Sequence, residues 1–303
     1  MVKVCLLGTG GMMPLPNRYL TSLLVATSGK LLLIDCGEGT QVTMKSLGWG
    51  FKAIECICFT HYHADHIAGL PGLLLTIGNS GKIDPLTLIG PAGLKKVVEG
   101  LTVISPNLPF EIKFIEILEE QEVSLQIAEF EINTLNLQHG IQCLGYSISI
   151  NRRRKFNLLL AEEKKIPKKI WNRLQRGESV IAEGTLFTPD MVLGEDRKGL
   201  KICYCTDTRP IEEIIPFVKE ADLFICEGMY GSDEYLIKAK EYRHMLFSEA
   251  ANLSKAAKVK ELWLTHYSPS LKDPENYLEV AKNIFTPTVL GEDRMTKELN
   301  FEE

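Results

Sequence analysis

Three histidines and one aspartate lie within six consecutive residues, and this cluster limits what the chain can fold into more than any other feature. Its members are His61, His63, Asp65 and His66, which follow an apolar, strand-like run and lead into a helical pattern. Imidazoles and carboxylates are costly to bury unless they meet a partner, and a bound cation supplies one. Because His61 and His63 alternate at a strand end, both rings aim at one point. The cluster therefore predicts a divalent-metal site.

The rest of the chain offers ligands for a second ion. Asp65 and His66 lie on the turn after the first two histidines and can reach a second point. Among the six histidines of the chain, His139 and His266 also close strand-like runs. Asp207 follows another such run; alone it would be an ordinary turn or helix-cap aspartate, but beside a metal cluster we expect it to bridge two ions. These ligand types suit two Zn²⁺ ions, with Mn²⁺ as the alternative.

Short apolar runs rich in β-branched residues recur along the chain, and each predicts a strand. They are Val2 to Leu7, Leu31 to Ile34, Ile54 to Phe59, Leu86 to Ile89, Phe130 to Leu135, Leu144 to Ile150, Lys201 to Cys205, Leu223 to Cys226 and Leu262 to Leu264. Helical patterns occupy residues 38–47, 66–77, 92–101, 211–219, 233–244, 247–257 and 275–284. Strands with their own helices in both halves predict an α/β fold, an αβ/βα sandwich of two mixed sheets with outer helices.

A charged stretch interrupts this pattern at residues 152–199. It concentrates basic side chains, contains Pro167 and Pro189, and has few apolar runs. We expect one metallohydrolase domain over residues 1–303 with this stretch inserted as a protruding arm, although charge-rich stretches are often only solvated surface. With a net charge of −5, the whole chain lacks the basic surface of nonspecific nucleic-acid binders. Any contact with a polyanion must be local, and the arm is where we expect it.

The composition predicts a cytoplasmic protein. No stretch approaches the roughly 20 apolar residues that a membrane-spanning helix needs, and the N-terminus runs into a strand without a signal-peptide layout. The eight cysteines mostly lie in strand-like contexts. We therefore expect them to be small buried side chains that the cytosol keeps reduced.

A glycine-rich run near the N-terminus does not match a nucleotide-binding loop. Gly8-Thr9-Gly10-Gly11 follows a strand, but the third glycine of a dinucleotide loop and the Lys-Ser/Thr pair of a phosphate loop are missing. Pro14 and Pro16 also stand where the helix would begin. We expect a tight turn near the site instead.

The His-x-His-x-Asp-His pattern at residues 61–66 resembles the signature of the metallo-β-lactamase superfamily. Within it, the chain resembles ribonuclease Z, the endonuclease family that trims tRNA 3′ trailers. The shared features are Asp35-Cys36-Gly37-Glu38-Gly39-Thr40-Gln41, the run at 61–74, Asp207-Thr208-Arg209, His244 and Leu264-Thr265-His266-Tyr267-Ser268. They extend over nearly the whole chain. The resemblance implies the metallo-β-lactamase fold and a homodimer in which the arm of one subunit serves the site of the other.

The resemblance also implies a role for each site residue. One ion would be held by His61, His63 and His139, the other by Asp65, His66 and His266, and both by Asp207. In the family, the aspartate matching Asp65 accepts a proton from the attacking water. The histidine matching His244 assists at the scissile phosphate, and Glu227 matches an acidic position that orients this histidine. The alternative for Glu227 is an exposed loop glutamate.

Two departures from the family concern the substrate rather than the metal chemistry. The arm resembles the family's tRNA-binding exosite in its Lys/Arg content and around Trp171, but Ile166-Pro167-Lys168-Lys169 stands where many members have a Pro-Pro-Gly-Pro turn. Arg243 and Met245 flank His244, where the family has small polar residues. Both changes affect the expected contact with tRNA.

We therefore predict a metal-dependent endoribonuclease of the ribonuclease Z type, which uses a metal-activated water to cleave the 3′ trailer from precursor tRNA. The alternative is another phosphodiesterase on the same scaffold that acts on small or cyclic nucleotides, for which the arm would be dispensable. A third hypothesis is a noncatalytic RNA-binding or metal-sensing protein. The complete ligand set and the presence of His244 disfavour it.

Overall fold

The computed structural model of the 303-residue chain describes residues 1–105 and 107–302. The chain divides into two compact units. The first is built from Met1–Ile150 and Leu200–Asn300, and the second from Asn151–Gly199 with Phe301 and Glu302. None of the helices in the described residues is long and apolar enough to cross a membrane.

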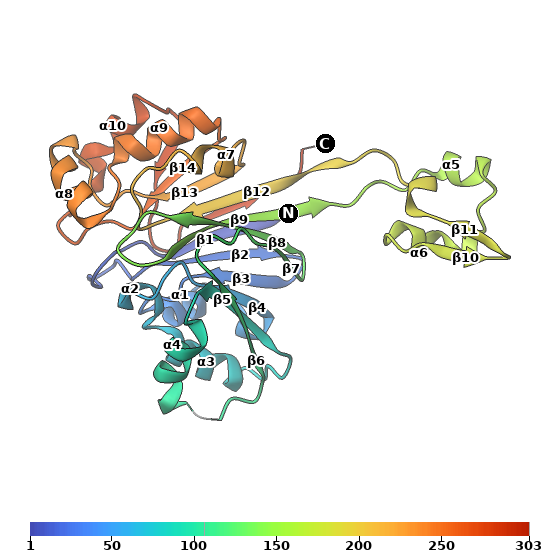
Figure 1. The fold of residues 1–303 in the computed structure, drawn as a ribbon, viewed down its shortest axis with the longest axis horizontal. Coiled ribbons are helices and arrows are strands. Elements are labelled where there is room, and N and C mark those ends of the chain that lie inside the picture. Colours follow the sequence, from blue (N-terminus) through green and yellow to red (C-terminus); the bar gives the residue numbers. More distant parts are fainter. Residues whose placement is uncertain (106, 303) are drawn as a thin grey trace. The chain divides into compact units, whose positions relative to one another are not determined.

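The first unit contains two seven-stranded sheets (Figure 1). The first sheet has the strand order β16-β1-β2-β3-β4-β5-β6. Its strands are β1 (Val2–Gly8), β2 (Ser22–Thr27), β3 (Lys30–Ile34), β4 (Ile54–Cys58), β5 (Leu86–Pro91), β6 (Ile112–Ile117) and β16 (Thr296–Leu299). Neighbours from β16 to β3 are antiparallel and those from β3 to β6 are parallel, so the sheet is mixed.

The second sheet has the strand order β15-β14-β13-β12-β9-β8-β7. Its strands are β7 (Ser124–Ile127), β8 (Phe130–Leu137), β9 (Cys143–Arg152), β12 (Arg197–Cys205), β13 (Leu223–Glu227), β14 (Leu262–Thr265) and β15 (Thr288–Leu290). β12 to β15 are parallel, whereas β7 to β9 are antiparallel. The carboxyl ends of the parallel strands therefore meet at one edge, which brings together the residues that follow them.

Helices cover the outer face of each sheet (Figure 1). Those of the first sheet are α1 (Thr40–Ser46), α2 (Ala64–Ile67), α3 (Leu70–Asn79) and α4 (Leu94–Leu101). Those of the second are α7 (Ile214–Val218), α9 (Phe247–Ala257) and α10 (Leu278–Lys282), with α8 (Leu236–Tyr242) nearby. Short 3₁₀ turns lie at Phe51–Ala53, Thr102–Ile104, Lys168–Ile170, Pro189–Met191, Asp233–Tyr235 and Pro274–Tyr277.

Both sheets are buried on both faces, which makes the first unit a layered sandwich. On β3, Leu31 packs with the helices of the first sheet, and Leu32 on the opposite face is fully buried as well. On β13, Phe224 packs with the helices of the second sheet, and its neighbour Ile225 is also fully buried. The inner faces cover each other, so the architecture is the predicted αβ/βα sandwich of two mixed sheets (Figure 1).

The apolar runs of the sequence predict the interior of the sheets better than their edges. Every predicted run lies on an observed strand, and the helix predicted at 247–257 is α9. The strands that the runs do not predict include β6, β7, β15 and β16, which are the four sheet edges. An edge strand such as β16 is partly exposed and lacks a continuous apolar run. β2 is also absent from the prediction, although its residues are buried and largely apolar.

The helix predicted at residues 66–77 divides into α2 and α3. The break occurs at Gly69, whose backbone N–H donates to the carbonyl oxygen of Cys36 at 2.9 Å instead of to a helical carbonyl. A side chain at Gly69 would collide with Gly37, since its Cβ would lie 2.2 Å from that carbonyl oxygen. The break therefore fastens the loop after β3 against the segment that carries Asp65 and His66.

The eight cysteines are all buried and carry free thiols, as the sequence predicts. Burial raises the pKa of the Cys36 thiol to about 12 and that of Cys203 to about 11. These thiols stay protonated near neutral pH and behave as small apolar side chains of the core.

The second unit has a small hydrophobic core of its own. It consists of α5 (Leu158–Glu163), α6 (Trp171–Gln175) and a hairpin of β10 (Val180–Ala182) and β11 (Thr185–Phe187). Leu174, Val180 and Val192 are buried together, and Trp171 packs against them. The indole N–H of Trp171 donates to the carbonyl oxygen of Ile166 at 2.9 Å. The charged stretch is therefore an ordered unit with charges on its surface.

Candidate metal centre

The first group of candidate ligands gathers where β4 and β8 end. His61 and His63 lie between β4 and α2, and His139 follows β8. Nε2 of His61 is 2.9 Å from Nδ1 of His63, which is 3.4 Å from Nε2 of His139. Together with Asp207, these residues offer donor atoms that all lie within 4.8 Å of one another. A cation coordinated by all four groups fits this convergence of lone pairs.

The second group combines residues from both ends of the chain. Asp65 and His66 lie on α2, and His266 directly follows β14. Nε2 of His66 is 3.2 Å from Nε2 of His266. Oδ2 of Asp65 lies 3.5 Å from each of these nitrogens. This group also meets within 4.8 Å and could hold a second ion.

Asp207 connects the two groups with one oxygen for each. Its Oδ1 lies 3.9 Å from Nε2 of His61 and 3.8 Å from Nε2 of His139. Its Oδ2 lies 3.2 Å from Nε2 of His66 and of His266. A carboxylate in this position can bridge two ions. The structure thus brings all seven candidate ligands, which the sequence spreads from position 61 to position 266, into one cluster.

Two of the candidate ligands have an unusual backbone conformation. The φ angle is 52° at Asp207 and 57° at His266, a left-handed conformation that residues other than glycine rarely adopt. The ring of His266 lies against Gly11, where a Cβ would be 2.7 Å from the imidazole. Gly11 also begins a tight turn, in which Met13 N–H donates to its carbonyl oxygen at 2.8 Å. The glycine-rich run therefore lies at the site and leaves room for His266.

Asp35, which is not among the predicted site residues, orients two of the ligands. It is fully buried after β3, and its Oδ2 accepts a hydrogen bond from Nδ1 of His66 at 2.8 Å. The Thr60 hydroxyl donates to the same oxygen at 2.8 Å and lies 3.0 Å from Nδ1 of His61. These contacts hold the Nδ1 protons and leave Nε2 of each ring free for a metal. The sequence marked Asp35 only by its position after an apolar run and as the first residue of the stretch 35–41, which resembles ribonuclease Z.

Of the cluster's groups with shifted pKa values, all but His66 favour the protonation state that binds a metal ion. Burial lowers the pKa of His61 and His139, so both imidazoles stay neutral. Burial alone would raise the pKa of Asp65 and Asp207, but the neighbouring histidines hold both below their usual range. At His66, burial is outweighed by Asp207 and a second carboxylate, which raise its pKa. The carboxylates thus stabilise a positive charge here, whether a proton or a metal ion.

His244 faces the cluster from the loop after α8. Its Nδ1 is 3.0 Å from Oε2 of Glu227 and 3.8 Å from Oδ1 of Asp207. Glu227 ends β13 and is fully buried, so it is not an exposed loop residue, and its Oε1 accepts from Thr208 N–H at 2.5 Å. Burial alone would lower the pKa of His244, but Glu227 raises it to about 9. His244, Asp207 and His266 also form a third candidate ligand group.

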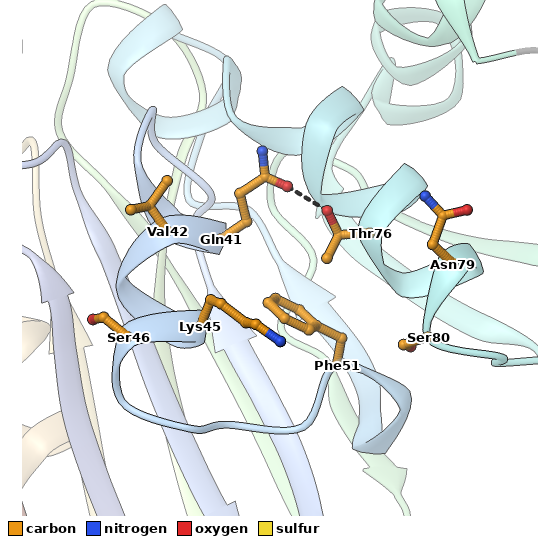
Figure 2. A pocket seen from close by; sticks show the side chains of 8 residues that line it. All are labelled: Gln41, Val42, Lys45, Ser46, Phe51, Thr76, Asn79 and Ser80. Atoms are coloured by element: carbon orange, nitrogen blue, oxygen red, sulfur yellow. Dashed lines mark hydrogen bonds between the residues drawn. The ribbon is translucent and has the colours of Figure 1, made fainter.

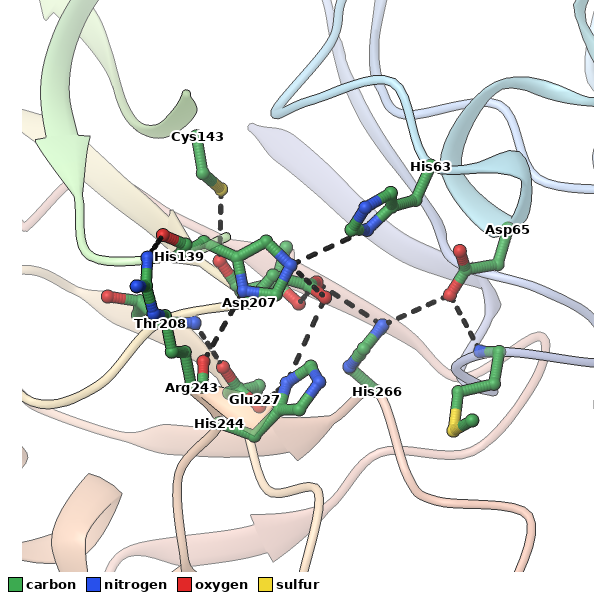
Figure 3. A network of polar contacts seen from close by, with 12 residues as sticks. His63, Asp65, His139, Cys143, Asp207, Thr208, Glu227, Arg243, His244 and His266 are labelled. Atoms are coloured by element: carbon green, nitrogen blue, oxygen red, sulfur yellow. Dashed lines mark hydrogen bonds and ion pairs between the residues drawn. The ribbon is translucent and has the colours of Figure 1, made fainter. Parts of the chain in front are cut away.

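Two arginines outside the predicted set fasten the loops that carry His139 and His244. Arg209 forms a two-point ion pair with Glu249, with Nη1 2.9 Å from Oε2, and also donates to the carbonyl oxygen of His244. Arg243 donates to the carbonyl oxygen of His139 (Figure 3). Because both arginines act through backbone carbonyls, residue spacing could not reveal these roles. The only signal for Arg209 was its place directly after Asp207 and Thr208.

The cluster opens into a pocket of about 420 Å³. Figure 3 shows His139, His244 and His266 converging on Asp207 in the polar network at this site. The pocket is lined by Met12, His63, Asp65, His139, Asp207, Tyr230, Lys238, Tyr242, His244, His266 and Ser268. Candidate ligands, a charged imidazole and aromatic side chains therefore share one cavity.

A larger hollow of about 700 Å³ lies between α1 and α3 (Figure 2). There the Thr76 hydroxyl donates to Oε1 of Gln41 at 2.6 Å. Among the described residues that line this hollow, only Lys45 carries a charge. It offers no set of metal ligands and no acid–base pair, so the chemistry is assigned to the smaller pocket.

Comparison with known proteins gives matches over the whole chain. A protein named Ribonuclease Z from Clostridium acetobutylicum is 56% identical over 307 residues, which cover 100% of this chain and 99% of that protein. Ribonuclease Z from Clostridium kluyveri is 56% identical over 303 residues and covers 100% of both chains. A family model described as anti-Pycsar protein Apyc1 matches residues 2–182.

Solved structures share the fold. The short form of human tRNase Z has a TM-score of 0.70 and 25% identity, and the match covers 99% of this chain and 100% of that chain. YhfI, a metallo-β-lactamase fold protein from Bacillus subtilis, has a TM-score of 0.69 and 21% identity, with 98% of each chain covered. The αβ/βα sandwich described above is therefore the metallo-β-lactamase fold.

Replacing Asp35 by asparagine is expected to weaken metal binding about 10- to 100-fold, since the amide holds less firmly the Nδ1 proton of His66 and the Thr60 hydroxyl that contacts His61. The measurement is metal content by mass spectrometry after dialysis against a series of chelator concentrations. Asp84→Asn, at an exposed position, is the matched control and should behave as the unmodified protein. Equal metal retention by the folded Asp35→Asn variant would contradict the orienting role.

Proposed function

The chain belongs to the ribonuclease Z family and, over residues 2–182, to the family described as anti-Pycsar protein Apyc1, and on this premise we propose that it is a tRNA 3′-processing endoribonuclease. The observation that carries the proposal is 56% identity to proteins named Ribonuclease Z over 100% of the chain. The Apyc1 match ends before Asp207, His244 and His266, whereas the ribonuclease Z matches include them. The alternative, a phosphodiesterase for small or cyclic nucleotides, has no comparable observation in its favour.

We propose that the cluster holds two divalent metal ions. One would be bound by His61, His63 and His139, the other by Asp65, His66 and His266, and both by Asp207. The support is the placement of the two Asp207 oxygens, each of which faces a different set of imidazoles. Imidazole and carboxylate ligands suit zinc, our choice for the metal, and manganese is the alternative. Such ions lower the pKa of a shared water towards ~7 and stabilise charge on the phosphate.

Asp65 is our candidate for the group that takes up the proton of the attacking water. Its Oδ2 is held by the backbone N–H of Met12 at 2.6 Å. The same oxygen faces Nε2 of His66 and of His266. Asp65 is therefore fixed at the point where the second ion would be bound, and it lines the pocket that a phosphodiester would enter.

His244 is our candidate for the proton donor to the leaving oxygen. Glu227 engages its Nδ1 and raises its pKa to about 9, so the imidazole is charged near neutral pH. This engagement leaves Nε2 available to a substrate in the pocket that His244 lines. A positioned acid of this kind contributes typically about 10²- to 10⁴-fold to the rate. In this proposal His244 contacts the substrate, and Glu227 is the residue that positions it.

We propose that the second unit, which contains the arm, provides the surface that binds RNA. Residues 151–199 contain twelve Lys or Arg against seven Asp or Glu, a net charge of +5, although the whole chain carries −5. The basic side chains at its helices are exposed, and the described residues offer no ion-pair partner to Lys164, Lys165 or Arg176. Exposed cations of this kind bind phosphates with strong salt dependence and without reading bases.

Two further features of the proposal follow the family resemblance. We propose a homodimer in which the arm of one subunit serves the site of its partner, and sedimentation of the purified protein would test this assembly. The cytoplasmic location expected from the sequence stays a prediction.

The proposed activity predicts that the metal-loaded protein makes a single cut at the 3′ trailer of a labelled precursor tRNA. A chelator should abolish the cut, and Zn²⁺ should restore it. In the same assay, His244→Asn should lower kcat about 10²- to 10⁴-fold while metal content stays unchanged. His139→Asn is the matched control that should lose metal as well as activity.

Two outcomes would contradict this account. If folded, metal-loaded protein makes no 3′ cut, the proposed function is wrong. If His244→Asn loses one metal ion, His244 is a ligand in the third group rather than the proton donor.

The arm is expected to bind precursor tRNA through electrostatic attraction between its lysines and the RNA phosphates. In Lys164→Gln/Lys165→Gln, precursor tRNA should bind more weakly, and the slope of log Kd against log salt should fall by about 1 for each lysine–phosphate pair that the substitutions remove. Lys95→Gln/Lys96→Gln removes the same charge from two exposed lysines of α4 and should leave the slope unchanged. Hydrolysis of bis(4-nitrophenyl) phosphate should be equal in all three proteins. An unchanged salt slope in the arm variant would show that these lysines do not bind RNA.

A further inference from the structure

One wall of the metal pocket is built from side chains that have no part in metal binding or proton transfer. Tyr230, Lys238 and Tyr242 line the same cavity as Asp65 and His244. They come from the segment after β13 and from α8. Aromatic rings and a cation beside a phosphodiester site are the two kinds of group that hold single-stranded nucleic acid, through stacking on bases and pairing with phosphates.

The spacing along α8 places Lys238 and Tyr242 on one face of the helix. Lys238 and Tyr242 are four residues apart in the helix, so their side chains are neighbours. Tyr242 lines the pocket and leaves 53% of its surface exposed, so part of its side chain is available to an incoming base. Ile237 on the same helix is 82% exposed and is not a pocket residue. Exposure alone is common on helices; the difference is that Tyr242 opens towards the metal ligands.

Lys238 contacts one aromatic ring, that of Tyr230. Its Nζ lies 5.2 Å from the ring centroid of Tyr230, a cation–π contact. Tyr230 is only 5% exposed and stacks on Tyr235, with ring centroids 5.6 Å apart. The described residues show no ion pair between Lys238 and an acidic side chain. The ammonium is therefore fixed at the pocket wall and available to a phosphate.

The end of α8 lies next to His244, the candidate proton donor, in the sequence. Tyr242 is the last residue of the helix and is two residues before His244. Arg243 between them has a left-handed φ of 59°, and the backbone N–H of His244 donates to the carbonyl oxygen of Ala239 at 2.9 Å. This hydrogen bond fixes the position of the Tyr242 backbone relative to the backbone of His244. A nucleotide whose phosphate meets His244 would have its neighbour within reach of Tyr242.

We propose that Tyr242 and Lys238 form a subsite for the nucleotide next to the scissile phosphate, with Tyr242 stacking on its base and Lys238 pairing with the adjoining phosphate. The proposal rests on the proposed ribonuclease function and specifies how its RNA substrate is held at the site. Every base has a π face, so a stacking subsite accepts any of the four nucleotides. Tyr230 and Tyr235 are the positioning residues that support Lys238.

The test combines protein variants with substrates that lack one base. Tyr242→Ala should raise KM for precursor tRNA about 5- to 150-fold, the range found when a stacked aromatic is removed. Tyr242→Phe keeps the ring and should behave as the unmodified protein, as should Ile237→Ala, the control on the same helix. A precursor with an abasic nucleotide beside the cleavage site should raise the KM of the unmodified protein by the same factor. With Tyr242→Ala, the abasic nucleotide should cause no further rise in KM.

Several results would overturn the subsite. They are an unchanged KM in Tyr242→Ala, a rise in KM in Tyr242→Phe as large as that in Tyr242→Ala, or independent effects on KM. Independent effects mean that Tyr242→Ala and the abasic nucleotide together raise KM by the product of their separate factors. The last result would mean that Tyr242 acts on folding or on His244 and not on a base.

A measurement of RNA binding distinguishes failure of the proposed subsite from failure of the proposed function. A fluorescent single-stranded RNA of trailer length is titrated into metal-loaded protein, with no cleavage required. Weaker binding by Tyr242→Ala and by Lys238→Gln, with Ile237→Ala unchanged, would support the subsite even if the unmodified protein failed to cut precursor tRNA. Equal affinity in all variants would refute the subsite even if cleavage were observed.

Discussion

The structure depends on one electrostatic constraint, which is that imidazoles and carboxylates from distant parts of the chain meet in one small volume. Asp207 is buried at its centre, with His61 and His139 near one oxygen and His66 and His266 near the other. Leaving such groups without water costs several kcal/mol unless they are compensated. The raised pKa of His66 shows that the carboxylates already attract positive charge to this point. Two cations shared by the cluster, as we propose, would compensate all the groups together.

The fold supplies this arrangement by ending strands at one edge of each sheet. His61, His139, Asp207 and His266 all lie in loops after strands, and Asp207 and His266 are held in left-handed backbone conformations. A second layer of contacts then fixes the side chains: Asp35 orients ligand rings, and ion pairs and arginine–carbonyl bonds fasten the loops. Strain at single residues is tolerated because the two sheets and their helices determine the surrounding backbone.

The sequence predicts much of this fold because buried strands and metal clusters leave local signals. Interior strands such as β4 and β13 are apolar runs, whereas edge strands such as β16 are partly polar and give no run. Four ligands were predicted from spacing alone because they lie within six residues. His139, Asp207 and His266 became candidates through their positions after strand-like runs, and the family resemblance then assigned them to particular ions. Asp35 and Arg243 could not be assigned, since they act through a proton and a carbonyl rather than through the metal. The proposed subsite of Lys238 and Tyr242 was missed because these residues are one helical turn apart and give no local sequence signal.

Anomalous diffraction tests most directly whether two metal ions bind, one on either side of Asp207. Crystals of the zinc-loaded protein, measured above and below the zinc absorption edge, should show two peaks. One should lie among His61, His63 and His139, the other among Asp65, His66 and His266, and each should be bonded to a different oxygen of Asp207. A single peak, or a peak ligated by His244 in place of either group, would contradict the account.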